Sequence, residues 1–128
     1  MTLAKSKGLT GFALNIGADP YTQKQLDLGY AAAQAIGFDV FISFDFNWYQ
    51  ISDVSGVATM LGGYVGHPAQ LLVDGKPFVS SFIGEGFDWS AVAQQIGREL
   101  YTVPYWAPTQ ANADNPGLRG LFSWYVDL

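Results

Sequence analysis

Short runs of hydrophobic residues recur along the chain, most of them bounded by glycine, and they predict buried strands. The runs are residues 11–16, 38–46, 77–83, 100–106 and 120–124. Nearly continuous apolarity is what a strand requires when both of its faces are covered, as in a parallel sheet that packs against helices. The pattern therefore predicts a sheet of about five parallel strands.

The segments between the first four runs have the periodicity of amphipathic helices. They are residues 21–36, 53–64 and 88–98. In the first of them Leu26, Tyr30 and Ala33 share one face, and Gly37 follows as a C-cap. The polar, proline-containing stretch 109–119 predicts a loop. This alternation of strands and helices predicts a single α/β domain with right-handed crossovers.

Polar and aromatic residues gather at the predicted strand ends, where the functional residues of parallel sheets are usually found. The candidates for substrate binding are Asn15, Asp45, Asn47, Glu85, Trp106 and Trp124. Amides and carboxylates can fix the hydroxyl groups of a sugar, and flat rings can cover its CH faces. The strand ends therefore predict a carbohydrate cleft.

Each of these candidates also has a structural interpretation. Asp45 could hold neighbouring loop amides, Glu85 could be a mobile charge between two glycines, and both indoles could belong to the core. We expect Asp19 to be a turn residue or helix N-cap, and Asp53 and Asp88 to be helix N-caps.

Composition and charge exclude several other functions. The net charge is -5 and no lysine or arginine cluster is present, so neither nucleic acid nor an anionic membrane is an expected partner. No apolar run approaches the roughly 18 residues that a membrane-spanning helix needs. Cysteine is absent and the single histidine, His67, has no second ligand beside it. We therefore expect no metal site, and a structural hydrogen bond for His67.

Two further kinds of chemistry are poorly supported by the sequence. No glycine-rich nucleotide loop is present. Ser80 and Ser81 lie within a predicted strand and have no convincing triad partner. Carboxylates remain as the candidate catalytic groups, and most enzymes that cleave glycosidic bonds use a pair of them.

Several segments, taken together and in order, form a specific pattern. They are residues 11–17, 21–26, 37–47, 74–82, 88–89 and 120–124. This pattern resembles the N-terminal half of glycoside hydrolase family 71, the fungal α-1,3-glucanases or mutanases, and the resemblance runs from about Ala4 to Trp124.

The resemblance implies a (β/α)8 TIM barrel, of which residues 1–128 would be one incomplete domain. It also implies endo- or exo-acting hydrolysis of α-1,3-glucan with inversion at the anomeric carbon, and no cofactor. The resemblance further implies an extracellular enzyme that acts on cell-wall glucan or on the bacterial glucan called mutan. Residues 1–8 have no apolar core of a signal peptide. They read instead as the end of a helix that stops at Gly8, which predicts that a preceding segment, with the family's first strand, is missing.

The chain also departs from the family. The two acidic residues associated with catalysis lie in a Trp-Asn-Asp-aromatic-Gly-Glu segment that has no counterpart here. The resemblance therefore assigns catalysis to none of the residues of this chain. It places Asp45 and Glu85 in the wall of the cleft, and it predicts that the chain alone is inactive.

Other interpretations stay open. The chain could be a non-catalytic glucan-binding fragment or an inert remnant of a gene model, or it could be a complete flavodoxin-like sheet with helices on both faces. Five strands cannot close an eight-stranded barrel, so a partial barrel would leave open sheet edges. Those edges predict that the isolated chain is marginally stable, aggregates or pairs with itself.

Overall fold

The computed structural model describes residues 11–122 and shows an α/β fold with a five-stranded sheet. The strands are β1 (Gly11–Ile16), β2 (Asp39–Asp45), β3 (Leu72–Val73), β4 (Lys76–Phe82) and β5 (Tyr101–Thr102). The helices are α2 (Thr22–Ile36), α3 (Val54–Gly62), α4 (Trp89–Ile96) and α5 (Gln110–Ala113). None of the helices in this part of the chain is long and apolar enough to cross a membrane.

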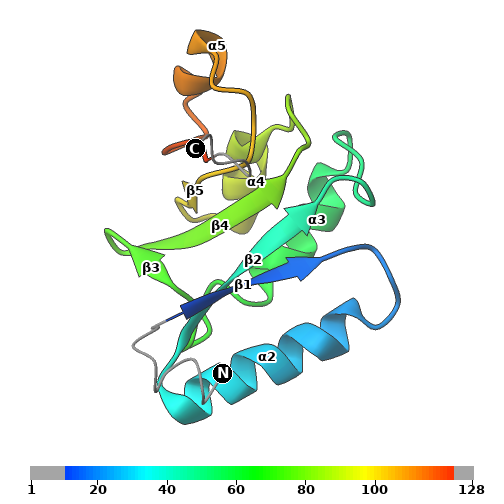
Figure 1. The fold of residues 1–128 in the computed structure, drawn as a ribbon, viewed down its shortest axis with the longest axis vertical. Helices are drawn as coiled ribbons and strands as arrows, with labels where there is room; N and C mark the ends of the chain where they lie inside the picture. Colours follow the sequence, from blue (N-terminus) through cyan, green and yellow to red (C-terminus); the bar gives the residue numbers. More distant parts are fainter. Residues whose placement is uncertain (1–10, 123–128) are drawn as a thin grey trace, which may run out of the picture.

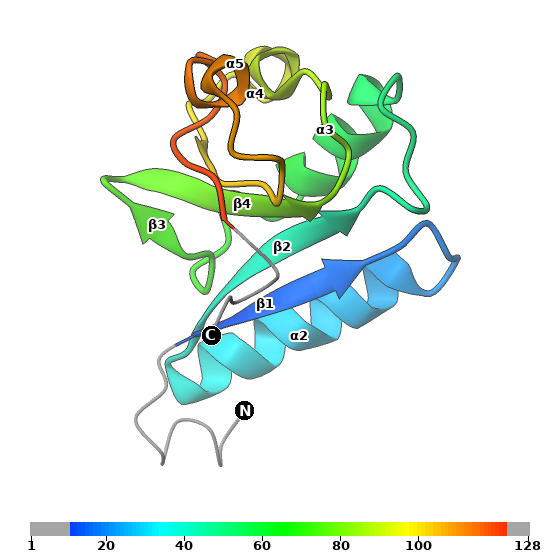
Figure 2. The same cartoon turned by 45° about the horizontal axis from the view of Figure 1, so that its top comes forward.

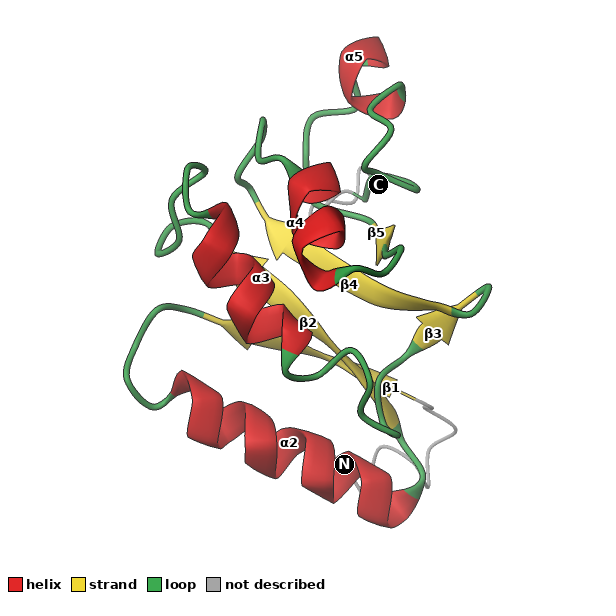
Figure 3. Ribbon diagram, turned by 180° about the vertical axis from the view of Figure 1, so that it is seen from behind, coloured by secondary structure: helices red, strands yellow, loops and turns green. Residues whose placement is uncertain are grey.

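Four of the strands are parallel and follow one another across the sheet in the order β1-β2-β4-β5. Helices α2, α3 and α4 all lie on the same face of this sheet (Figures 1 and 3), while α5 stands beyond its end. Figure 2 shows α2 lying along β1 on that face. A flavodoxin-like domain would have helices on both faces, so that interpretation is wrong for the described residues.

Alternation along β2 explains how the helix-covered face is packed. Val40, Ile42 and Phe44 are fully buried, and they belong to the same core as the buried residues of α2 and α4. The Phe44 ring lies 6.0 Å from the ring of Trp89, the first residue of α4. Asp88, before it, caps α4 by accepting from the Ala91 amide, as predicted.

The predicted caps and helix ends are largely confirmed. Asp53 caps α3 by accepting a hydrogen bond from the Gly56 amide at 3.0 Å. Gly37 ends α2 in the left-handed conformation that glycine adopts most easily. Within the stretch predicted as a loop, however, the short helix α5 forms, because the Thr109 hydroxyl accepts from the Asn112 amide and caps it.

Two of the five predicted strands differ in the structure. Residues 100–106 pair as a regular ladder only at Tyr101–Thr102, and contact β4 again through an isolated bridge at Tyr105. Pro104 lies between them and has no N–H to donate to a ladder. Residues 120–122 form no strand, and the rest of that run lies outside the described residues.

The structure also contains a strand that the sequence analysis missed. Strand β3 pairs with the start of β4 in an antiparallel hairpin around Asp74 and Gly75. Both turn residues have positive φ, 52° and 75°, which is the geometry of a tight hairpin turn and explains the Asp-Gly pair. Among the described residues, the fifth strand of the sheet is therefore this hairpin strand.

A buried glutamine fixes the region where this hairpin enters the sheet. Residues 69–71 lie between the amino ends of β2 and β4. There the backbone amide of Val40 donates to the Ala69 carbonyl, and the backbone amide of Phe78 donates to the Leu71 carbonyl. The Gln70 amide is only 4% exposed, and its Nε2 donates to the carbonyls of Leu71 and Phe78 at 3.0 Å each. Its Oε1 accepts from the Tyr30 hydroxyl of α2 at 2.6 Å. One side chain thus ties a helix to two segments of the sheet.

Two aromatic neighbours complete this cluster. The Tyr30 ring stacks on Tyr64 with centroids 4.8 Å apart and meets His67 edge-on at 5.0 Å. His67 Nδ1 accepts from the Ala69 amide at 3.0 Å, so the predicted structural role of this histidine is confirmed. The Tyr64 hydroxyl donates to the Asp27 carboxylate at 2.6 Å.

Replacing Gln70 with leucine should cost about 2–4 kcal/mol of unfolding free energy, because Tyr30 and Phe78 would keep buried polar groups without a partner. Urea denaturation followed by circular dichroism measures this cost. Gln95→Leu is the matched control, since Gln95 is exposed and bonds only weakly to Ser55 at 3.4 Å. Equal stability of the two variants would contradict the role given to Gln70.

The pH dependence of stability follows from the two buried tyrosines. Burial is the main reason why the pKa values of Tyr30 and Tyr64 are raised above the usual value for tyrosine. The neighbouring Tyr64 adds to the effect on Tyr30, and the bond to Asp27 adds to the effect on Tyr64.

An unfolded tyrosine ionises near pH 10, and the folded chain holds these two protons more tightly. Their contribution is therefore fully present below about pH 10 and is lost as the pH rises toward the folded-state pKa values. We expect the unfolding free energy from urea titrations to fall above about pH 10. The double variant Tyr30→Phe, Tyr64→Phe should show a shallower fall, and an equally steep one would contradict this assignment.

Candidate functional site

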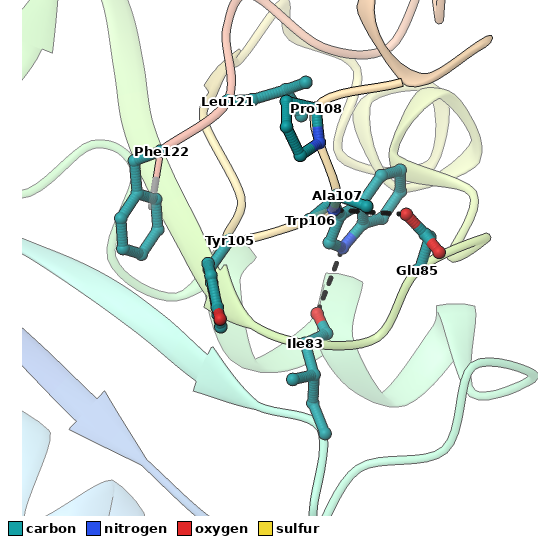
Figure 4. A pocket seen from close by; sticks show the side chains of 8 residues that line it. All are labelled: Ile83, Glu85, Tyr105, Trp106, Ala107, Pro108, Leu121 and Phe122. Atoms are coloured by element: carbon teal, nitrogen blue, oxygen red, sulfur yellow. Dashed lines mark hydrogen bonds between the residues drawn. The ribbon is translucent and has the colours of Figure 1, made fainter. Parts of the chain in front are cut away.

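Two hollows lie at the carboxyl ends of the parallel strands. The first hollow, after β1 and β2, is lined by Asn15, Ile16, Gly17, Ala18, Asp19, Asp45 and Trp48. The second hollow, after β4 and β5, is lined by Ile83, Glu85, Tyr105, Trp106, Ala107, Pro108, Leu121 and Phe122 (Figure 4). Four of the six predicted site residues thus line these hollows, Asn15 and Asp45 in the first and Glu85 and Trp106 in the second.

Asp45 ends β2 and combines both roles considered for it. Its Oδ1 accepts from the Asn47 amide at 2.9 Å, and its carbonyl accepts from the amides of Trp48 and Tyr49. These bonds close a tight turn after the strand. The Asp45 side chain also lines the first hollow, together with Asn15 from the end of β1. Asn47 is exposed in the same turn but does not line the hollow.

Trp48 is a residue of this hollow that the sequence analysis missed. Its side chain is 66% exposed although it is the largest apolar group in the turn. The indole lies against the backbone of Gly17, where an added Cβ would come within 3.1 Å of Trp48 Cδ1. Its place in the loop directly after a strand rich in buried residues was the available signal.

Asp19 lies in the loop after β1 and was predicted as a turn residue or helix N-cap. Its Oδ1 accepts from the Tyr21 amide at 3.0 Å and its carbonyl accepts from the Thr22 amide, which confirms the turn role, while the N-cap position of α2 is Tyr21. Asp19 also lines the first hollow. The pKa of Tyr49 is raised, mainly by burial and further by the negative charges of Asp19 and Asp53.

Glu85 connects two loops in the second hollow. Its Oε1 accepts from the Ala107 amide at 3.2 Å, the contact drawn in Figure 4, and also accepts from Asn112 Nδ2. The same Nδ2 donates to the Ala107 carbonyl at 2.8 Å. The carboxylate therefore holds the loop after β5 onto the loop after β4, and it is not the mobile charge that was considered as an alternative.

The glycines beside Glu85 allow this loop to form. Gly84 and Gly86 have φ values of 82° and 90°, a region that side-chain-bearing residues rarely adopt. An added Cβ at Gly84 would also lie 2.4 Å from Cγ of Phe46, so no larger residue fits there without displacement of that ring.

Trp106 contributes only a small part of its ring to the second hollow. It is 4% exposed, belongs to the core and donates from Nε1 to the Ile83 carbonyl at 3.0 Å (Figure 4). Its assignment to substrate binding stays a prediction. Trp124, the other predicted indole, lies outside the described residues.

The arrangement can bind neutral polar groups beside aromatic surface. Between residues 11 and 122, no group of three acidic, histidine or cysteine side chains could hold a metal ion. The strand serines have structural roles: Ser80 Oγ donates to Val103 O at 2.7 Å and Ser81 Oγ donates to Ile83 O at 3.2 Å. Carboxylates, an amide and rings remain as the groups that face the hollows.

Comparison with known proteins adds independent information. The chain is 39% identical over 127 residues to a mutanase of Penicillium rubens, an alignment that covers 97% of this chain and 28% of that protein. It is 33% identical over 134 residues to a glucan endo-1,3-alpha-glucosidase of Schizosaccharomyces pombe, covering 91% of this chain and 31% of that protein. The chain thus spans less than a third of either relative. No solved structure matches it significantly.

The family model for glycosyl hydrolase family 71 matches residues 1–126. Nearly the whole chain is included in that match. The chain therefore belongs to glycosyl hydrolase family 71.

Proposed function

We propose that this chain is part of an α-1,3-glucan hydrolase and forms one wall of its substrate cleft. The observation that carries the proposal is the family match together with two relatives named for cleavage of such glucans. Polar and aromatic side chains at one edge of the sheet support it, since both kinds of group are needed to hold a sugar.

The proposal includes a TIM barrel as the architecture of the complete enzyme. In such a barrel, consecutive parallel strands are neighbours and all helices lie outside. The order β1-β2-β4-β5 and the single helix-covered face fit this arrangement. The opposite face would then be the barrel interior.

The composition of that opposite face supports the same architecture. Aromatic rings form a row across the strands, with Phe41 and Phe78 4.6 Å apart and Phe78 and Tyr101 5.9 Å apart. Ser43 and Ser80 pair beside these rings on β2 and β4, and this face is hollowed over them. Bulky side chains that point inward from the strands fill the interior of a TIM barrel.

In the proposed enzyme these residues bind substrate and the catalytic acids come from elsewhere. An inverting glycosidase needs a general acid and a general base about 6.5–9.5 Å apart, with room for water between them. Asp45 and Glu85 each accept hydrogen bonds from loop amides, which suits groups that hold a loop and a sugar hydroxyl in place. We therefore give neither residue a role as acid or base.

The remaining parts of the proposal follow from the family. The enzyme would be extracellular, would act on cell-wall glucan and would need no cofactor. The isolated chain would associate with itself through open edges of its sheet. A second candidate function is a non-catalytic glucan-binding fragment, which the exposed ring of Trp48 beside polar groups favours.

The purified chain should release no reducing sugar from α-1,3-glucan above background, because it lacks the acidic segment that the family uses for cleavage. A full-length enzyme of the family serves as the positive control under the same conditions. Release that depends on the amount of purified chain would contradict the proposed division of roles. Retention of the inactive chain on insoluble α-1,3-glucan would support the binding function.

Replacing Glu85 with alanine should lower this retention about fivefold and should speed proteolysis between residues 105 and 112, because the loop loses its hydrogen-bond acceptor. Glu99→Ala is the matched control, since Glu99 forms only exposed ion pairs of 3.8 Å with Lys76 and Arg119. Unchanged retention and unchanged proteolysis in the Glu85 variant would contradict a role for Glu85 in the cleft. Trp106→Ala is a poorer probe, because emptying a core site costs about 3–5 kcal/mol.

A further inference from the structure

We propose that the first hollow is a distinct subsite for a neutral glucosyl unit, with Trp48 as its stacking platform. This inference rests on the proposed function and specifies which part of the chain contacts the glucan. Trp48 belongs to none of the positions that the sequence predicted, and the first hollow is separate from the second, in which Glu85 holds the loops together.

The indole of Trp48 is exposed but held in place. Its ring lies against Gly17, and its backbone amide donates to the Asp45 carbonyl at 3.0 Å. Two thirds of the side chain nevertheless face solvent, at 66% exposure. A large apolar surface that the fold supports and leaves uncovered is the form expected of a stacking platform.

The polar groups around this ring determine what can bind. Asp19 and Asp45 each use Oδ1 to accept a backbone amide, at 3.0 and 2.9 Å, so their carboxylates are oriented before any ligand arrives. Neither forms an ion pair with a residue between 11 and 122. Their remaining lone pairs, together with the side-chain oxygen of Asn15, can accept the hydrogen bonds of several hydroxyl groups.

The charge of the hollow excludes other classes of ligand. Its lining contains two carboxylates and no lysine or arginine, so phosphates and sugar acids would be repelled. The described residues provide no third acidic or histidine ligand there for a metal ion. A neutral sugar ring fits both the carboxylates and the indole of this hollow, because it has hydroxyl donors at its edge and CH groups on its face.

The sheet order gives the separation of the two hollows. The first follows the β1–β2 pair and the second follows the β4–β5 pair, so their centres are about two strand spacings, or roughly 10 Å, apart. That separation is longer than a single pyranose ring. Only a glucan of several units can therefore contact both hollows at once.

The test is calorimetric titration of the full chain with α-1,3-linked glucose oligosaccharides of increasing length. Trp48→Ala should weaken binding of the longer oligosaccharides about five- to tenfold, and Trp48→Phe should keep most of the affinity. Ile51→Ala is the matched control, because Ile51 is 55% exposed near the same turn but does not line the hollow. It should bind like the unaltered chain.

Each outcome has a separate meaning. Binding by the unaltered chain with equal affinity in Trp48→Ala overturns this subsite and leaves the proposed function in place. No binding of any α-1,3-linked oligosaccharide by the unaltered chain overturns the proposed function and the subsite with it. Acrylamide quenching in a Trp124→Phe background gives a second measurement, since of the three remaining indoles Trp48 is exposed whereas Trp89 and Trp106 are buried. A saturating oligosaccharide should reduce quenching in this background, and unchanged quenching overturns the stacking role of Trp48.

Discussion

The hydrogen bond from Tyr30 to Gln70 is the contact on which the arrangement of the other elements depends. A buried amide is stable only when all of its polar atoms have partners, and Gln70 finds them in α2, in Leu71 and in β4. Tyr30 is 40 residues away from Gln70 in the sequence, whereas Leu71 directly follows Gln70 and Phe78 is eight residues further on. Satisfying this one side chain therefore fixes the position of α2 against the sheet and the place where the hairpin enters it.

This constraint acts at the amino ends of the strands, while the hollows lie at the carboxyl ends. Residues 69–71 separate β2 from β4 at one end, but at the other end the two strands pair directly through Ser43–Ser80 and Asp45–Phe82. Exposed side chains in the loops after the strands, such as Trp48, can therefore bind a ligand, although Phe46 and Trp106 of the same loops belong to the core. Such a division between stability and function is usual for parallel α/β folds.

The sequence predicted those parts of the fold that depend on local patterns. Strand β1 was predicted with its observed ends, since its apolar run is bounded by glycine on both sides. The length of strand β5 at Tyr101–Thr102 was overestimated, because a proline within the apolar run interrupts the hydrogen-bond ladder. Strand β3 was missed, although the Asp-Gly pair of its turn was a visible signal. The loop held by Glu85 could not be predicted, because its partners depend on how two distant loops meet.

The contact between Phe46 and Gly84 links the two hollows and limits which polymers could occupy both of them. Phe46 directly follows Asp45 of the first hollow, Gly84 directly precedes Glu85 of the second, and Phe46 donates its amide to Phe82 at 3.1 Å. With a ring wedged against a glycine backbone, the two hollows cannot slide past each other. The distance between the two hollows is therefore fixed. The distance between the sugar rings of a glucan, which its linkage sets, would have to match this fixed distance for the rings to occupy both hollows.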